Sequence, residues 1–496
     1  MSEPLALLIR AGHPLILVET TDEDRAAGIV RATGGALQRK VCDWSLTRGL
    51  WELDEQGQPK REHAPAGKPA DALKYVLRSG EQTVFIFRDL GPHLKDAAVH
   101  RLLRDLCPVC RNMRCAVVCL EYLPFPAEAS RLVVRFDIGW PTSVELEQTV
   151  RETYQRIKDE SLYEVTSQIT RREMEQLVHT LRGLTASEAE RVIASAIYQD
   201  YQLSGNDLSR IVDAKRQLLG STGCLESIVA DFSPDDIGGL ANLKDWLRTR
   251  RGGFSQEARD FGVEPPRGVL MLGVQGCGKS LCAKVVASDW AMPLLRLDPG
   301  VLYQKYIGES EGRLRQALRQ AEAMAPVVLW IDEIEKAFAS ASADSADGGL
   351  SQRMFGTLLT WMQDHRHPIF MVATANDVSQ LPPELMRKGR FDEMFFIDLP
   401  DVAARARILG IHLARRKRDP AKFDLDALSV AADGFSGAEL EQAIRSGLYA
   451  AFAKKQELTT AILLNELSQT RSLSVVMPER LASLRAWAKE RCVSAD

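Results

Sequence analysis

Long apolar runs are missing from this sequence of 496 residues, and its most apolar segments, such as 326–331, are only as long as a strand. A helix needs roughly 20 consecutive apolar residues to cross a bilayer, so we expect no membrane-spanning helix. The N-terminus also lacks the pattern of a secretory signal, because it contains Glu3, and because Arg10 and His13 interrupt its first apolar run. We therefore expect a soluble protein that is not exported by that route.

Cysteines are few, and neither sign of charge is in large excess. Nine cysteines scattered over the chain do not form the dense disulfide framework of a secreted scaffold, which favours the reducing cytoplasm. The 63 Lys and Arg residues nearly balance the 67 Asp and Glu residues, for a net charge of −4. This balance provides no global positive field for a nucleic acid. We expect no membrane partner, and a nucleic-acid motor is the less favoured alternative.

The composition is that of a globular protein, and the length indicates two to four domains. Short apolar runs alternate with helical patterns in both halves of the chain, which is typical of parallel α/β architecture. The shared order favours a tandem duplication, although two unrelated doubly wound domains would give the same pattern. We expect strands at 15–19, 41–45, 84–89, 115–120 and 132–138, then helices to about 219, and strands at 268–273, 294–298, 327–332, 369–374 and 394–399, then helices again.

A glycine-rich segment follows the strand expected at 268–273. It reads Gly273-Val274-Gln275-Gly276-Cys277-Gly278-Lys279-Ser280 and fits the pattern G-x-x-x-x-G-K-[ST] between a strand and a helix. Glycines let backbone N–H groups turn inward around phosphates, Lys279 reaches the β and γ oxygens, and the Ser280 hydroxyl ligates Mg²⁺. The segment therefore predicts a site for ATP and Mg²⁺.

Polar side chains follow the next two strands along the chain. Asp332 and Glu333 come directly after a buried strand, and Asn376 follows the strand expected at 369–374. The carboxyl edge of a parallel sheet is where α/β proteins bind ligands. We expect Asp332 to hold Mg²⁺ through water, Glu333 to polarise the attacking water, and Asn376 to sense the γ-phosphate.

Two arginines lie three residues apart further along the chain. Arg387 and Arg390 flank a glycine that ends a short helical pattern, and their planar guanidinium groups suit the charge that develops on a transferred phosphoryl group. The alternative is that both arginines and Asn376 lie on a solvated rim without a catalytic role.

Seven segments in this order resemble the successive signatures of AAA+ ATPases, over about 231–453, and the whole chain resembles the Ycf-type AAA ATPases of red-algal plastids and cyanobacteria. The resemblance implies a ring-forming homo-oligomer, expected to be a hexamer. It also implies that Arg387 and Arg390 act in trans on a neighbouring subunit. Besides the phosphate loop and the acid pair, the segments are 236–240, 265–270, 306–311, 387–392 and 434–440.

By the same resemblance, Asp236 and Gly238 line the adenine pocket, and Tyr306 and Ile307 grip a substrate in a central pore. The sequence departs from the family at Cys277, where Thr is usual, and it has Ala438 where other clades carry a sensor arginine. A thiol at a helix N-terminus has a lowered pKa. We therefore add the hypothesis that Cys277 makes the ATPase redox-sensitive.

The first half lacks the groups that bind phosphate. Its first strand is followed by Glu19-Thr20-Thr21-Asp22-Glu23-Asp24-Arg25, with no glycine and no Lys-Ser pair. Its third strand ends in Arg88-Asp89, one acid beside a base, where the second half has two acids. We expect a degenerate, nucleotide-free module that serves assembly or substrate docking.

The expected fold is α/β, with a P-loop AAA+ module and helical lid preceded by a degenerate AAA-like module that has its own helical segment. The regions would be 1–140 (degenerate α/β domain), 141–225 (helical region and linker, the linker at about 220–234), 226–400 (ATPase domain) and 401–496 (helical lid). We expect ATP hydrolysis coupled to remodelling or unfolding of a protein partner, in the cytoplasm or, if plastid-encoded, the plastid stroma. The alternative is an ATP-dependent binding switch or scaffold with little turnover.

Overall fold

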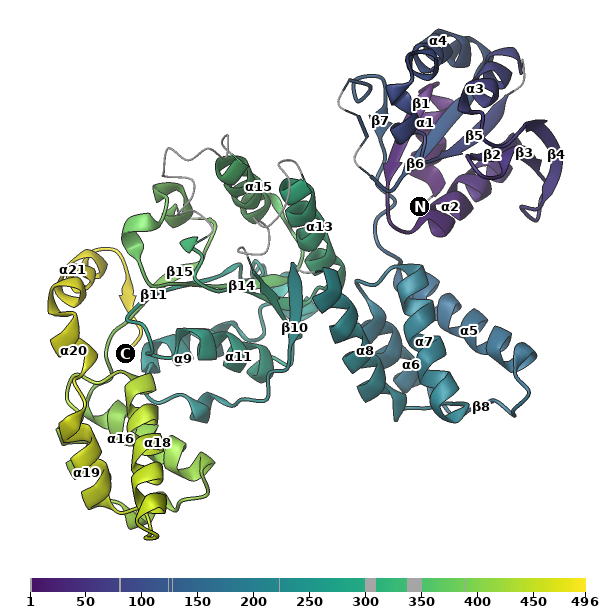
Figure 1. Ribbon diagram of the computed structural model, residues 1–496. Helices are drawn as coiled ribbons and strands as arrows, with labels where there is room; N and C mark the ends of the chain where they lie inside the picture. The colour runs from purple at the N-terminus through teal and green to yellow at the C-terminus, as the bar shows by residue number, and fades with distance from the viewer. Residues whose placement is uncertain are drawn as a thin grey trace. The chain divides into compact units, whose positions relative to one another are not determined.

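The computed structural model describes residues 2–79, 82–123, 125–126, 128–222, 224–298, 309–336, 350–387 and 389–496. The chain divides into two compact units, Met1–Ile211 and Val212–Asp496, and each contains a sheet with helices beside it (Figure 1). Each of these sheets has seven described strands. Among the described helices, none has the length and apolar character that crossing a membrane requires. Tyr306 and Ile307, the expected pore residues, lie outside the described residues.

The first unit begins with a sheet in the order β4-β3-β2-β5-β6-β1-β7. Parallel pairing joins all neighbours from β2 to β7, whereas β3 and β4 form an antiparallel hairpin in which β3 pairs with β2. The strands are β1 (Leu15–Glu19), β2 (Lys40–Ser45), β3 (Gly49–Leu53), β4 (Pro59–Ala64), β5 (Thr83–Arg88), β6 (Ala116–Glu121) and β7 (Val134–Arg135).

Helices cover both faces of this sheet because its central strands are apolar on both sides. On β1, Ile16 and Val18 pack with residues of two helices, while Leu15 and Leu17 belong to the core on the other face. The first pair of helices is α1 (Ser2–Arg10) and α2 (Glu23–Ala36), and the second pair is α3 (Pro69–Arg78) and α4 (Ala97–Met113).

A helical region completes the first unit. Three of its helices are N-capped by threonines, Thr142, Thr170 and Thr185, each of which forms a capping box with a glutamate three residues later. This reciprocal bonding satisfies backbone N–H groups at the helix start. The elements are α5 (Ser143–Glu160), α6 (Arg171–Leu181), α7 (Ala186–Asp200), the strand pair β8 (Thr166–Ser167) and β9 (Gln202–Leu203), and α8 (Asp207–Thr222), which continues past the unit boundary.

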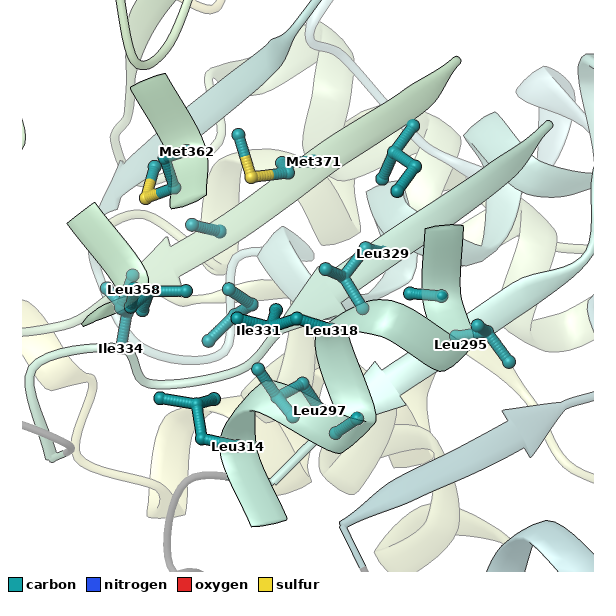
Figure 2. Close-up of a cluster of buried hydrophobic side chains, with 14 of the residues drawn as sticks. Leu295, Leu297, Leu314, Leu318, Leu329, Ile331, Ile334, Leu358, Met362 and Met371 are labelled. Atoms are coloured by element: carbon teal, nitrogen blue, oxygen red, sulfur yellow. The ribbon is translucent and has the colours of Figure 1, made fainter. Parts of the chain in front are cut away.

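The sheet of the second unit has the order β10-β12-β13-β14-β11-β15-β16. Figure 2 shows part of its core, in which leucines and methionines of the strands meet α13 and α15. The strands are β10 (Leu225–Ile228), β11 (Gly268–Gly273), β12 (Leu294–Leu297), β13 (Val327–Ile331), β14 (Ile369–Ala375), β15 (Glu393–Ile397) and β16 (Val493–Ser494). The helices beside them are α9 (Ala241–Arg250), α10 (Gln256–Asp260), α11 (Lys279–Asp289), α13 (Glu309–Met324) and α15 (Leu350–Asp364).

A helical lid follows the second sheet, and the chain then returns to that sheet. The lid helices are α16 (Val402–Arg415), α17 (Leu425–Ala431), α18 (Gly437–Ala453) and α19 (Thr460–Gln469). They are followed by α20 (Leu473–Val476) and α21 (Pro478–Lys489). The final strand β16 pairs in parallel with β15. Short 3₁₀ helices are η1 (Gly91–Lys95), η2 (Pro234–Asp236), η3 (Val378–Gln380), η4 (Pro383–Met386) and η5 (Pro420–Lys422).

A strand is present at each of the five positions predicted in each half, although the one predicted at 132–138 is only Val134–Arg135, and the two sets occupy equivalent places. The order β7-β1-β6-β5-β2 in the first unit matches β15-β11-β14-β13-β12 in the second, which supports the duplication. The hairpin β3–β4, β10 and β16 were not predicted. The linker prediction at 220–234 is wrong in part, because this segment ends α8 and forms β10, which pairs antiparallel with β12.

A buried ion network stabilises the carboxyl edge of the first sheet. The Arg88 side chain is only 8% exposed and donates to both Asp43 oxygens, at 3.0 and 2.7 Å, and to Glu23 at 2.6 Å. A longer contact of 3.3 Å reaches Asp24. Burial acts to lower the pKa of Arg88, but hydrogen bonds and charges from Asp43 and Glu23 more than reverse it, so the net pKa is raised.

We predict that the two aspartates on this guanidinium contribute unequally to stability. The Asp43 side chain is 12% exposed and that of Asp24 is 90% exposed. Breaking a buried pair costs about 3 kcal/mol, whereas exposed pairs contribute less than about 1 kcal/mol. In urea unfolding of the full chain, Asp43→Ala should therefore destabilise the first unit far more than Asp24→Ala does. Equal effects would contradict this account.

Candidate nucleotide site

The loop between β11 and α11 is shaped by glycines. Gly276 and Gly278 have φ values of +79° and +91°, in the left-handed region that glycine adopts without steric cost. Gly278 precedes the first residue of α11, Lys279, whose Nζ donates to the carbonyls of Gly273 (2.9 Å) and Val274 (2.7 Å). The ammonium group thus lies inside the turn of the loop.

A cavity of about 270 Å³ opens beside this loop. It brings together most of the residues predicted to bind phosphate and magnesium, the acid pair and the expected sensor, which come from three strand ends and one helix start. The lining residues are Gln275, Gly276, Gly278, Lys279, Ser280, Leu281, Asp332, Glu333, Thr374 and Asn376.

The nearby acidic groups do not fully compensate the positive charge of the buried Lys279. Burial is the largest influence and lowers the pKa of Lys279 to about 8, although Cys277, Glu335 and Asp332 act in the opposite direction. A desolvated cation is stabilised by an opposite charge in contact with it. The loop is therefore electrostatically suited to a phosphate group next to Nζ.

Two hydroxyl groups hold one oxygen of Asp332. The Ser280 hydroxyl donates to Asp332 Oδ1 at 3.0 Å, and the Thr374 hydroxyl donates to the same oxygen at 2.6 Å. A serine hydroxyl beside a carboxylate supplies hard oxygen ligands, which Mg²⁺ prefers. The donor set at Ser280 and Asp332 therefore fits this ion.

Glu333 is held by three neighbouring groups. Asn376 Nδ2 donates to Glu333 Oε1 at 3.0 Å, and Lys336 forms an ion pair with Oε2. The backbone of Glu333 has a φ of +48°, a conformation unusual for a residue with a side chain. Its N–H donates to Thr374 Oγ1 at 3.0 Å, so the threonine contacts both acids.

Sequence reasoning missed two residues of this arrangement, Thr374 and Glu335. Thr374 is a buried hydroxyl in the otherwise apolar strand β14, which was the available signal. Glu335 is 4% exposed, and its Oε1 accepts the backbone N–H of Asn376 at 2.9 Å. Burial raises the pKa of Glu335. The sequence signal for Glu335 was the presence of a third acid two residues after Glu333.

The lid contacts the loop at the start of α18. The N–H of Ala438 donates to the carbonyl of Gly276 at 3.0 Å. A Cβ on Gly276 would lie 3.0 Å from Ala438 Cβ and 3.1 Å from Ser436 Oγ, so this glycine permits the close approach. Ser436 in turn caps α18 in a capping box with Glu439.

Gly273, Val274 and Cys277 belong to the loop but are not part of the cavity lining, and four further predicted site residues lie outside the loop and the lining. Asp236 forms an ion pair with Arg415 of α16 at 2.7 Å, and a Cβ on Gly238 would meet Ile408 and Ala404 of the same helix. Arg387 is exposed and Arg390 is partly buried. Within the described part of the chain, Nη1 of Arg390 has no hydrogen-bond partner.

The expected lowered pKa of Cys277 is wrong. Burial raises the pKa of this thiol to about 11, and the charge of Lys279 offsets only part of that effect. The thiolate is the reactive form of cysteine, and a thiol with a raised pKa forms little thiolate at neutral pH. The redox hypothesis thereby loses its physical basis, and Cys277 is read as a small side chain in place of Thr.

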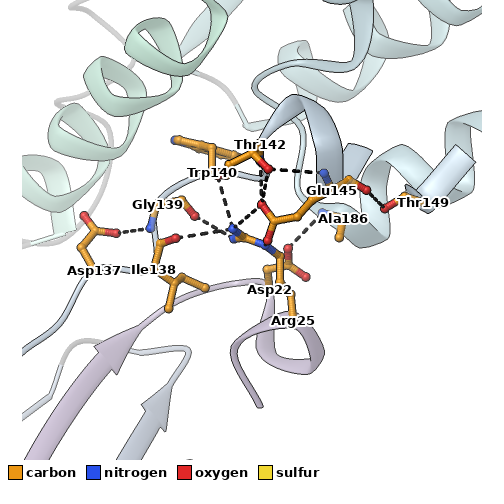
Figure 3. Close-up of polar contacts among 10 residues, drawn as sticks. All are labelled: Asp22, Arg25, Asp137, Ile138, Gly139, Trp140, Thr142, Glu145, Thr149 and Ala186. Carbon is orange, nitrogen blue, oxygen red and sulfur yellow. Dashed lines mark hydrogen bonds and ion pairs between the residues drawn. The ribbon is translucent and has the colours of Figure 1, made fainter. Parts of the chain in front are cut away.

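In the first unit, the segment after β1 is bonded to other parts of the protein (Figure 3). Asp22 is 4% exposed, and its carboxylate accepts the N–H of Ala186 at the start of α7 at 2.9 Å. Arg25 donates to the carbonyl of Gly139 at 2.8 Å and pairs with Glu145 of α5 at 3.3 Å. These bonds connect the first sheet to its helical region. They lie after β1, and the loop 273–280 follows β11, the equivalent strand of the second unit.

Comparisons with known proteins cover nearly all of the chain. The family model for AAA, the ATPase family associated with various cellular activities, matches residues 269–399. Models for the N-terminal domain and the second domain of SpoVK-like AAA ATPases match residues 1–138 and 144–222.

Relatives in two algae align along nearly their full length. The uncharacterized AAA domain-containing protein ycf46 of Pyropia yezoensis is 34% identical over 98% of this chain and 97% of its own. The protein of the same name in Guillardia theta is 34% identical over 97% of this chain and 94% of its own. A proteasome-activating nucleotidase of Aeropyrum pernix is 35% identical over 41% of this chain and 50% of its own.

Proposed function

Because the chain belongs to the AAA ATPase family, we propose that it hydrolyses ATP in the cavity between residues 273–280 and the acid pair Asp332-Glu333. One observation carries the proposal: a single cavity of about 270 Å³ is lined by the loop lysine, the hydroxyl and carboxylate suited to Mg²⁺, and a glutamate bonded to an amide. Phosphoryl transfer requires positioning and charge neutralisation by this set of groups.

Each side chain has a distinct role in this proposal. Lys279 neutralises the β and γ phosphates, and Ser280 and Asp332 would hold Mg²⁺, which would supply positive charge to neutralise the phosphates. Glu333 polarises the attacking water as a general base. Asn376, which bonds Glu333 at 3.0 Å, orients that base and senses the γ-phosphate.

Arg387 and Arg390 are proposed to act on the site of a neighbouring copy in a homo-oligomer, which we expect to be a hexamer. Neither lines the cavity of its own chain. Arg387 is exposed, and Nη1 of Arg390 has no hydrogen-bond partner among the described residues. These facts support a role in trans, where guanidinium groups stabilise the phosphoryl charge.

The work done with ATP is proposed to be remodelling or unfolding of a protein partner, in the cytoplasm or a plastid stroma. Tyr306 and Ile307 would contact that partner. A binding switch with little turnover is the second candidate, because both oxygens of Glu333 are engaged, one by Asn376 and one by Lys336. The turnover number distinguishes the two functions, since a remodelling enzyme must hydrolyse ATP repeatedly.

We predict that two substitutions separate binding from hydrolysis. Lys279→Ala should abolish ATP binding in calorimetry, because it removes the charge beside the phosphates. Glu333→Gln should retain ATP binding while turnover falls by about 10²-fold or more, in the range typical of general-base loss. The Glu333→Gln chain should then retain its protein partner in a pull-down with ATP.

Lys284→Ala is the matched control for Lys279→Ala, because Lys284 lies on the same helix outside the cavity lining. It should bind ATP as the unmodified chain does. Equal ATP affinity in Lys279→Ala and the unmodified chain would overturn the assignment of the loop.

We predict that Arg387→Ala lowers turnover by about 10³-fold, as loss of an arginine finger does, with little change in ATP affinity. When this variant is mixed with unmodified subunits, the ATPase activity should fall more steeply than the fraction of unmodified subunits does. A fall in simple proportion to the fraction of variant would show that Arg387 does not act across subunits.

A further inference from the structure

The first unit contains a second cavity, of about 310 Å³, at the edge that carries the β3–β4 hairpin. It lies among α2, the carboxyl ends of β2 and β5, and the hairpin. The hairpin is not part of the five-strand order that the two sheets share. Its lining residues are Arg31, Asp43, Ser45, Arg48, Trp51, Leu53, Gly57, Gln58, Pro59 and Arg88.

The lining has an excess of positive charge. Asp43 uses both carboxylate oxygens on Arg88, which also bonds Glu23. Within the described part of the chain, the guanidinium groups of Arg31 and Arg48 have neither a hydrogen bond nor an ion pair. Two cations in this cavity therefore remain available to a ligand.

The hairpin turn lies close to one of these cations. Gly57 has a φ of +80°, and a Cβ at this position would lie 2.9 Å from Arg31 Nη1. The turn is closed by Asp54, whose Oδ1 accepts the N–H groups of Gln56 and Gln58. This oxygen accepts two hydrogen bonds, so Asp54 helps to fix the shape of the turn.

The remaining wall is largely apolar. The indole N–H of Trp51 donates to the carbonyl of Arg48 at 2.7 Å, so its polar atom is satisfied and its ring contributes apolar surface. Leu53 and Pro59 extend this surface, and Ser45 and Gln58 add polar groups. A small cavity with an apolar wall and a few polar groups is the usual form of a ligand site.

We propose that this cavity binds a small molecule that carries an oxyanion, either phosphate or carboxylate, on a compact apolar body. Planar guanidinium forks match the geometry of both oxyanions, and Arg31 and Arg48 provide two of them. The apolar body lies against Trp51. This site is independent of the proposed ATPase site, which is in the other unit.

The test uses the full chain with Lys279→Ala, so that residues 273–280 do not contribute phosphate binding. Equilibrium dialysis measures radiolabelled inorganic phosphate in one arm and radiolabelled benzoate in the other, which distinguishes the two oxyanions. We expect saturable binding of one molecule per chain in at least one arm. Adding Arg31→Ala and Arg48→Ala together should weaken that binding at least tenfold.

Arg61→Ala is the matched control, because Arg61 is exposed on the same hairpin and is not part of the lining. It removes one arginine charge from the same hairpin and should leave binding unchanged. Far-UV circular dichroism should show equal folding of all variants. Two results would overturn the proposal: no saturable binding in either arm, or equal binding losses in Arg61→Ala and the double variant.

Discussion

The parallel pairing of β11, β13 and β14 is the constraint on which the nucleotide site depends. β14 lies between the other two strands, with Leu272 opposite Ala375 and Ile331 opposite Ala373. The three strands therefore end at one edge, and the loop, the acid pair and Asn376 follow directly. Thr374 then connects the acids through hydrogen bonds of 2.6 and 3.0 Å.

The same strand order carries different chemistry in the first unit. At the edge where the second unit has Lys279 and two acids, the first unit has Asp22 and Arg25 bonded to its helical region and Arg88 bonded to carboxylates. The guanidinium groups of Arg25 and Arg88 are thus paired with carboxylates of the protein itself. The same strand order thus occurs with and without a phosphate loop, since a fold does not determine its function.

Sequence reasoning predicted the features that local patterns encode and missed those that depend on distant contacts. The strands and the loop 273–280 follow from apolar runs and glycines next to each other in the chain. The pairing of β10 and the ion pair of Asp236 with Arg415 join residues far apart in sequence, so local patterns do not specify them. The predicted direction of the pKa shift of Cys277 is wrong, because burial raises this pKa more than the nearby positive groups lower it.

The central claim is that each chain has one nucleotide site, in the second unit, while the first unit holds none. Calorimetric titration of the Glu333→Gln chain with ATP tests this most directly, because hydrolysis does not interfere with the count. The account predicts one ATP bound per chain, and none once Lys279→Ala is added. Two ATP molecules per chain, or a site that survives Lys279→Ala, would contradict it.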